Sequence, residues 1–352
     1  MKDGISEEKF RAEQSEIVKQ LEAELIDKDR LLDDYKKEHG KLEVFFKRIE
    51  NAIKPVIQLK KVYDPSKSDR LGSPLIAVAH ITDGHMGQVQ LSEEIEGFGE
   101  FNPKICRDRQ LDFAIRFNSW VDNHRKGYPI DECHIIVTGD LISGDIHEEL
   151  RVTNAFPTPV QCIRAAEVLV EQISLFASDF GKVTVHFLVE DNHARLTKKP
   201  QATEAGYNSL NYIVGKHAEL YLRNTDNVEF NIYPQFEKVI TVGSRQYLIT
   251  HGHGIRGWMG IPWYSIERQV GKESTARLQI IMEDINRAKE IGFHKYCFGH
   301  YHTPFDHPLY MCGGSVSGTT AHDHKNGRHS GPSQASWLVG KHGEFDRTNF
   351  QL

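Results

Sequence analysis

The chain has 352 residues, of which 26% are charged, and a formal net charge of −6. This length allows one large α/β domain with an appendage, and no apolar run is long enough to span a bilayer. The mildly acidic charge gives no electrostatic argument for a nucleic-acid partner, although it does not exclude one.

The five cysteines are widely scattered and form no Cys-x-x-Cys pair. Their spacing argues against a disulfide framework and a zinc ribbon, and it favours a reducing compartment. The N-terminus is polar and charged, which is typical of neither a secretory signal nor a transit peptide. We therefore expect a cytoplasmic protein that does not enter a membrane.

Residues 1–60 are rich in Glu, Lys, Asp and Leu. Their apolar residues recur at spacings built from three and four, at Ile17, Leu21, Leu31, Tyr35, Leu42, Phe45, Ile49 and Val56. This pattern predicts a helical arm, either a coiled coil that could make the chain a homo-oligomer or a helical hairpin. An amphipathic helix packed on its own domain fits the pattern equally well. Residues 61–73 predict a linker, and residues 74–352 predict a separate domain.

Within that domain, apolar runs alternate with helical segments. The runs, which predict strands, are residues 74–81, 134–138, 183–189, 245–250 and 295–298. Helical periodicity marks residues 105–121, 159–176 and 266–291, and short strands are expected at 309–312 and 335–340. Strands that alternate with helices predict an α/β fold with a largely parallel sheet.

Each of the five apolar runs ends in Asp, Asn or His. The polar residues that follow them are Asp83 and His85, Asp140, Asn192 and His193, His251 and His253, and His300 and His302. Ligands bind at the carboxyl edge of strands in open α/β sheets, so we expect these side chains to converge. Imidazole and oxygen ligands without thiolates suit manganese, iron or zinc. The pattern therefore predicts a dinuclear metal site.

The five segments together resemble the calcineurin-like metallophosphoesterase superfamily. They are Asp83-Gly84-His85, Gly139-Asp140, Asn192-His193, His251-Gly252-His253 and Gly299-His300-Tyr301-His302. The resemblance covers roughly residues 75–338 and is closest in motif context to the DNA-repair exonuclease branch. It implies a four-layer α/β sandwich, with two mixed β-sheets flanked by helices, after the N-terminal helical arm.

The resemblance also implies the metal ligands. One ion would be held by Asp83, His85 and His302, and the other by Asn192, His251 and His300. Both would be divalent, with Mn²⁺ expected and iron or zinc as alternatives.

The catalytic roles follow from the same resemblance. Asp140 would bridge the two ions, and His193 would contact the phosphate and assist the leaving group. Asn192 would also contact the substrate. Arg195, a cation two residues after His193, could meet a phosphate, although a solvated basic turn is the plainer interpretation.

The implied activity is hydrolysis of a phosphodiester, by attack of a metal-bridging hydroxide, with DNA as the expected substrate of an exonuclease or endonuclease. A small-nucleotide or phosphomonoester phosphatase would use the same ligands, and a weakly active or non-catalytic scaffold can have the same fold. The tail after His302 is short, so a protein partner could complete the site. The aromatic residues Trp258, Trp263 and Tyr264 could stack bases or belong to the core.

The chain departs from the family pattern at Asp191, where Gly usually precedes the Asn-His pair. Asp tolerates left-handed backbone geometry better than most residues, so the turn can survive. A carboxylate close to the phosphate would repel an anionic substrate. This interpretation supports the weakly active scaffold, and it predicts that Asp191→Gly raises kcat/KM on a diester.

Overall fold

The computed structural model describes residues 72–352, apart from residues 147, 200–205 and 258–259. The predicted helical arm, and the predicted linker as far as residue 71, lie outside the described residues. Among the described residues, no helix is both long and apolar enough to cross a membrane.

Six strands form the first sheet, in the order β11-β10-β1-β2-β3-β4. They are β1 (Ile76–Ile81), β2 (Glu132–Val137), β3 (Lys182–Leu188), β4 (Val228–Tyr233), β10 (Ser333–Gly340) and β11 (Gly343–Gln351). Strands β1, β2, β3 and β4 are parallel to one another. On the other side of β1, β10 pairs antiparallel with β1, and β11 pairs antiparallel with β10. The strands β1, β2 and β3 are buried after their first residue, as expected for parallel strands covered on both faces.

Five strands form the second sheet, in the order β5-β6-β7-β9-β8. They are β5 (Glu237–Val242), β6 (Arg245–Thr250), β7 (Lys295–Phe298), β8 (Phe305–Asp306) and β9 (Tyr310–Cys312). The strands β6, β7 and β9 are parallel, whereas β5 and β8 pair antiparallel at the two edges. Both sheets are therefore mixed.

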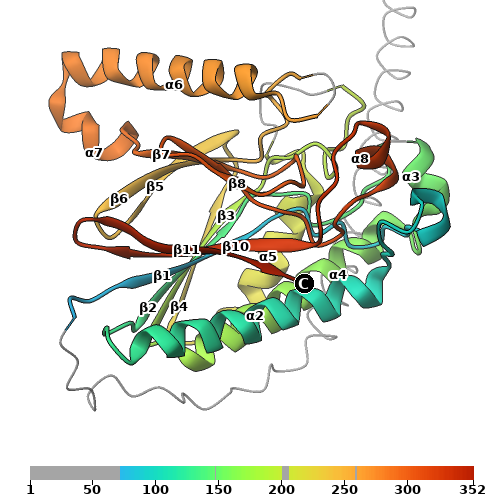
Figure 1. Ribbon diagram of the computed structural model, residues 1–352, viewed down its shortest axis with the longest axis horizontal. Coiled ribbons are helices and arrows are strands. Elements are labelled where there is room, and N and C mark those ends of the chain that lie inside the picture. The colour runs from blue at the N-terminus through green and yellow to red at the C-terminus, as the bar shows by residue number, and fades with distance from the viewer. Residues whose placement is uncertain (1–71, 147, 200–205, 258–259) are drawn as a thin grey trace, which may run out of the picture. The chain divides into compact units, whose positions relative to one another are not determined.

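Helices cover the outer faces of the two sheets (Figure 1). The helical elements are η2 (Ser92–Ile95), α2 (Pro103–Arg125), α3 (Glu148–Thr153), α4 (Thr158–Asp179), α5 (Leu210–Leu222), α6 (Trp263–Glu283), η3 (Ile285–Arg287), α7 (Ala288–Ile291) and α8 (Ala321–Lys325). Helices α2, α4 and α5 lie on the first sheet, and α6 and α7 lie over the second. The predicted arrangement of two mixed sheets flanked by helices is confirmed.

The main core fills the space between the sheets. Val78 and Ile136 of the first sheet pack in one buried cluster with Tyr247 and Ile249 of the second. Trp337 of β10 belongs to the same cluster, and its indole Nε1 donates to Tyr247 Oη across the layer at 2.9 Å. This packing fixes the two sheets against each other.

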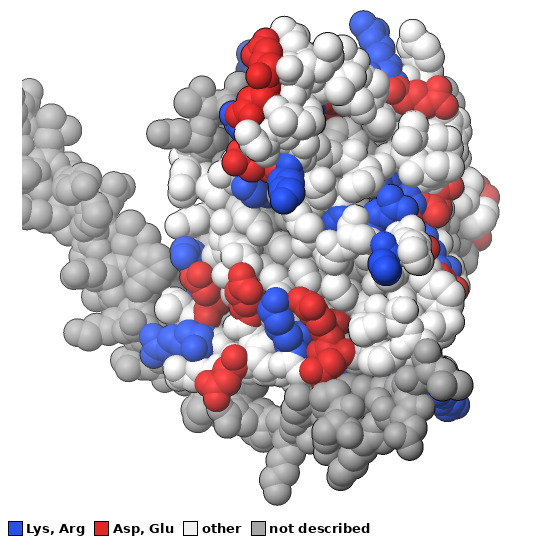
Figure 2. Space-filling model, turned by 90° about the vertical axis from the view of Figure 1, so that its left-hand side faces the viewer, with Lys and Arg blue, Asp and Glu red and all other residues white. Residues whose placement is uncertain are grey.

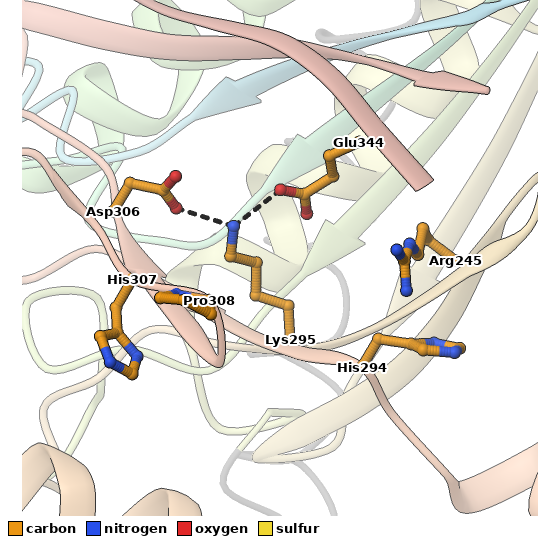
Figure 3. Close-up of a pocket in the computed structure, with 7 residues that line it drawn as sticks. All are labelled: Arg245, His294, Lys295, Asp306, His307, Pro308 and Glu344. Carbon is orange, nitrogen blue, oxygen red and sulfur yellow. Dashed lines mark hydrogen bonds and ion pairs between the residues drawn. The ribbon is translucent and has the colours of Figure 1, made fainter. Parts of the chain in front are cut away.

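An ion-pair group around a buried lysine joins the sheets at the amino end of β7. Lys295 Nζ lies 2.7 Å from Asp306 Oδ1 and 2.7 Å from Glu344 Oε2, although the lysine is only 5% exposed (Figure 3). These residues come from β7, β8 and β11. Removing either carboxylate would leave part of a buried charge uncompensated, which is costly. The group therefore holds the strands together at the end opposite the residues that follow β7.

The predicted elements correspond closely to the observed ones. The five predicted strands are β1, β2, β3, β6 and β7, and the helices at 105–121 and 159–176 are α2 and α4. The helix expected to reach residue 291 instead ends at Glu283. Asp284 is extended (φ −145°, ψ 101°), and its side chain accepts a hydrogen bond from Asn286 N. Such a local bond competes with the helix, because it satisfies backbone groups outside it.

Candidate metal centre

Polar side chains from both sheets meet where five strands end. Asp83 and His85 follow β1, Asp140 follows β2, and Asn192 follows β3. From the second sheet, His251 follows β6, while His300 and His302 follow β7. Each of these residues therefore lies just beyond the carboxyl end of its strand.

The backbone at this edge is held in an unusual conformation. Of the seven non-glycine residues with positive φ in the described ranges, five are predicted ligands: Asp83 (51°), His85 (46°), Asp140 (49°), His300 (70°) and His302 (59°). Left-handed geometry is uncommon outside glycine, although Asp and His tolerate it better than most. Each such residue costs about 1–3 kcal/mol, which persists only where the surroundings enforce it and is often found at functional sites.

Close backbone contacts enforce this geometry. Asp83 N donates to Gly139 O at 3.1 Å, and His85 N donates to Asp140 O at 2.9 Å. His300 N donates to both carboxylate oxygens of Asp83, at 3.1 and 3.0 Å. A Cβ at Gly299 would lie 2.4 Å from Asp83 Oδ2, so only glycine permits this approach.

The first donor cluster consists of Asp83, His85 and His302. One ligand atom from each lies within 4.8 Å of the others. His85 Nε2 and His302 Nε2 are 3.0 Å apart, and Asp83 Oδ1 is 3.9 and 3.5 Å from these two nitrogens. His85 and Asp83 are almost entirely buried.

The second donor cluster consists of Asp140, His251 and His300. His251 Nε2 lies 3.1 Å from Asp140 Oδ2 and 2.9 Å from Asn192 Oδ1, so the predicted amide ligand also belongs here. Asp140 also forms a further group of the same size with His85 of the first cluster and with His193. Asp140 therefore links the second cluster to His85 of the first, and its predicted role as a bridging carboxylate stays a prediction.

His193 lies beside this shared carboxylate. Its Nδ1 is 2.6 Å from the carbonyl oxygen of Ser143, which fixes the ring and makes Nδ1 the donor nitrogen. Its Nε2 lies 3.8 Å from Asp140 Oδ2, and its ring centroid is 4.8 Å from that of His85. The imidazole therefore turns Nε2 toward the donor clusters.

Asp323 is a site residue that the sequence analysis missed. Its Oδ2 lies 2.5 Å from His302 Nδ1, and the residue is 1% exposed. Thr320 Oγ1 also donates to Oδ2 at 2.7 Å, and Arg328 Nη2 lies 3.1 Å from Oδ1. A carboxylate that accepts from the far nitrogen of a metal-binding histidine fixes its tautomer and orientation. A capping box between Thr320 and Asp323, at the start of α8, was the available sequence signal.

Burial and nearby charges shift the pKa values of the histidines in both donor clusters. Burial opposes protonation of His251, but the surrounding carboxylates, Asp140 foremost, together raise the pKa of His251 to about 10. Burial likewise opposes protonation of His302, but Asp323 and Asp83 together raise the pKa of His302 to about 10. Burial lowers the pKa of His85 to about 3, so its lone pair is available at neutral pH. Divalent cations would displace the two protons, because ligands bind in the deprotonated form. The donor set fits two divalent ions.

We expect Asp323→Asn to weaken metal binding about 10–100-fold, the usual effect of removing a partner of a ligating histidine. The amide keeps the size of the carboxylate but loses the charge that orients His302. The measurement is the Mn²⁺ dissociation constant by calorimetry, with Lys325→Ala, an exposed change in the same helix, as the control. An unchanged dissociation constant in Asp323→Asn would remove this role.

The structure corrects the interpretation of Asp191. Its side chain is 1% exposed and turns toward the backbone: Oδ2 accepts from Asp140 N at 2.7 Å and from Asn211 Nδ2, and Oδ1 accepts from Ala194 N at 2.7 Å. Burial, and then the charge of Asp140, raises the pKa of Asp191 to about 7. The carboxyl group therefore supports the two turns that carry Asp140 and His193, and the expected repulsion of substrate loses its basis.

Accordingly, Asp191→Gly should destabilise the fold and lower activity. The change leaves two buried backbone N–H groups, those of Asp140 and Ala194, without the acceptor that Asp191 supplies, at roughly 1–3 kcal/mol each. Urea unfolding of the variant measures the loss of stability, and initial rates measure the activity. Unchanged stability together with a higher kcat/KM would reinstate the repulsion argument.

Two other residues near the site, Arg195 and His253, contact neighbouring polar groups of the protein. Arg195 donates to the backbone carbonyls of Asn192 (2.9 Å), Thr197 (3.0 Å) and Lys198 (3.3 Å), so it orders the loop after β3. Its predicted phosphate contact remains a prediction. His253 Nε2 lies 3.2 Å from the buried carboxylate of Glu190, beside the second cluster.

Comparisons with known proteins leave the family of the chain open. No family model matches the chain, and no curated protein matches it. Among solved structures, a Vps29 variant from Entamoeba histolytica is 12% identical, with a TM-score of 0.30, over 78% of this chain and 99% of that one. A putative 5′-nucleotidase from Staphylococcus aureus is 8% identical, with a TM-score of 0.30, over 79% and 54%. The sulfate thiohydrolase SoxB from "Termus thermophilus" is 10% identical, with a TM-score of 0.32, over 81% and 58%. Similarity at this level shows nothing about the activity of this chain. The functional proposal therefore rests on the geometry of the site.

Proposed function

We propose that the chain is a dinuclear metal-dependent phosphoesterase that hydrolyses phosphodiester bonds. The observation that carries this proposal is the pair of donor clusters that meet at Asp140, with the His193 imidazole beside them. Oxygen and imidazole donors without thiolates suit manganese, iron or zinc, and we propose Mn²⁺ among these. Asp83, His85 and His302 would hold one ion, while Asn192, His251 and His300 would hold the other.

When bound, two divalent ions supply a water nucleophile at neutral pH and neutralise charge on the phosphate. The contribution of the chain is positioning. Asp140 N is held by Asp191, and His193 N donates to Asp140 Oδ1 at 3.3 Å, so the shared carboxylate and the imidazole have a fixed relation. The carbonyl of Ser143 holds His193 Nδ1–H, which leaves Nε2 as the nitrogen that can take up a second proton and, in the imidazolium form, give it to the leaving oxygen.

We propose a nucleic acid as the diester. The face shown in Figure 2 carries basic and acidic residues interspersed, which gives no continuous basic surface for a phosphate backbone. We therefore place the contact at the metal-bearing edge, where the two cations would attract the anion. The weakly active scaffold is not favoured, because its support was a carboxylate of Asp191 directed at the substrate.

A substrate panel with Mn²⁺ tests the proposal. The substrates are p-nitrophenyl phosphate, bis-p-nitrophenyl phosphate, a cyclic nucleotide, and single- and double-stranded DNA. We expect hydrolysis of the bis-ester and of DNA, and none after removal of metal by a chelator. Turnover of the monoester alone would indicate a phosphomonoesterase instead, and turnover of no ester in the metal-loaded protein would contradict the proposal.

A further inference from the structure

Three aromatic rings, those of Phe98, His324 and His329, form a cluster that includes a residue of helix α8. The ring centroid of Phe98 lies 4.5 Å from that of His329 and 5.4 Å from that of His324, with interplanar angles of 31° and 41°. The two imidazoles are 5.2 Å apart, at 72°. Phe98 is 52% exposed, so this large apolar side chain is open to solvent although its ring packs against two imidazoles.

The turn after η2 is built to present Phe98. Ile95 is fully buried and anchors the turn, and its carbonyl accepts from Phe98 N at 2.9 Å. Glu96 and Gly97 between them are both left-handed, with φ of 53° and 85°. This reversal brings the chain back toward solvent at Phe98. The exposure of the ring is therefore a consequence of a defined turn.

Helix α8 ties the aromatic cluster to the metal centre. Asp323 holds the predicted metal ligand His302 at 2.5 Å, and the next residue, His324, belongs to the aromatic cluster. On the other side, Ala321 N donates to Gln90 Oε1 at 2.8 Å, and Gln90 Nε2 donates to Glu94 Oε2 in η2 at 2.7 Å. Phe98 therefore has a fixed position relative to the donor clusters. In Figure 1, α8 and α3 lie at the same end of the molecule.

The geometry points to a base-stacking platform: we infer that Phe98, supported by His324 and His329, binds a nucleobase of the substrate whose phosphate lies at the metal centre. Exposed aromatic faces stack bases without requiring a particular sequence, because every base has a π-face. The inference rests on the proposed function. It adds that the substrate binds as an unstacked, single-stranded nucleotide.

The other exposed aromatic residues of the described part that the sequence singled out lack this connection. Trp263 packs against Phe305 with ring centroids 4.6 Å apart, and Tyr264 is 76% exposed at the start of α6. Neither is bonded to a residue that holds a predicted ligand. Tyr264 is therefore a matched control for the loss of an exposed aromatic ring.

Equilibrium binding separates the base from the phosphate. The probes are thymidine 5′-monophosphate and 2-deoxyribose 5-phosphate, which differ only by the base, measured by calorimetry with Mn²⁺. We expect the wild type to bind the nucleotide more tightly. Phe98→Ala should weaken nucleotide binding about 5–150-fold, the range for loss of one stacked base. It should leave deoxyribose 5-phosphate binding unchanged, and Phe98→Tyr and Tyr264→Ala should retain nucleotide binding.

Equal affinities of the wild type for the two probes, or the same effect of Phe98→Ala on both, would overturn the inference. If that result accompanies hydrolysis of bis-p-nitrophenyl phosphate, the platform is wrong and the proposed function stands. If no ester is hydrolysed and neither phosphate binds, the proposed function fails and the platform fails with it. Thermal unfolding of each variant shows whether the fold is retained.

Discussion

Replacing Asp140 with Asn is expected to reduce the hydrolysis of every ester to background. Asp140 belongs to the second donor cluster, where it lies 3.1 Å from His251 Nε2, and it also groups with His85 of the first. The amide is close in size but removes the negative charge, so both ions lose a ligand together. We expect a loss of roughly 10²–10³-fold or more, because a preorganised charged group at a reaction centre contributes at least this much.

The matched control is Asp145→Asn, the same chemical change at an exposed residue on the same loop. It should leave metal content and activity unchanged. Circular dichroism of the Asp140 variant should match the wild type, which separates loss of metal from loss of fold. Full activity in Asp140→Asn, or equal losses in both variants, would refute the shared role of Asp140.

Replacing His193 with Ala is expected to lower turnover by roughly 10²–10⁴-fold, the range for a general acid or base. The metal content should stay the same. The reason is geometric: Ser143 O holds Nδ1 at 2.6 Å, and Nε2 remains directed toward the site without being part of either predicted ligand set. The measurement pairs kcat with elemental analysis of bound metal.

His85→Ala provides the comparison, since its ring lies 4.8 Å from that of His193 but belongs to the first ligand set. That variant should lose metal and activity together. A loss of metal from His193→Ala would instead make His193 a ligand, in agreement with its grouping with His85 and Asp140. Full activity in His193→Ala would mean that another group supplies the proton.

The strands that carry the site were predictable because their signal is local. An apolar run followed within three residues by Asp, Asn or His indicates both the strand and its functional end, and β1, β2 and β6 show this pattern. The antiparallel edge strands β5 and β11 were not predicted. Their residues alternate between buried and exposed or are largely exposed, so they form no continuous apolar run.

The missed and misjudged residues depend on contacts that a linear pattern does not contain. Asp323 lies in a five-residue helix without apolar periodicity, and its role comes from His302, 21 positions earlier. Asp191 is adjacent to the predicted ligand Asn192, yet its side chain turns toward the backbone of Asp140. Adjacency in sequence does not specify side-chain direction, because the backbone dihedrals of the turn decide it.

The number of metal ions bound by each chain tests the central claim most directly. The full chain is stripped with a chelator, reloaded with Mn²⁺, freed of excess metal and examined by elemental analysis. The two clusters that meet at Asp140 predict two ions per chain in the wild type and in His193→Ala, and fewer than two in Asp140→Asn. A wild type that holds one ion or none, or an Asp140→Asn variant that still holds two, would contradict a dinuclear centre bridged by Asp140.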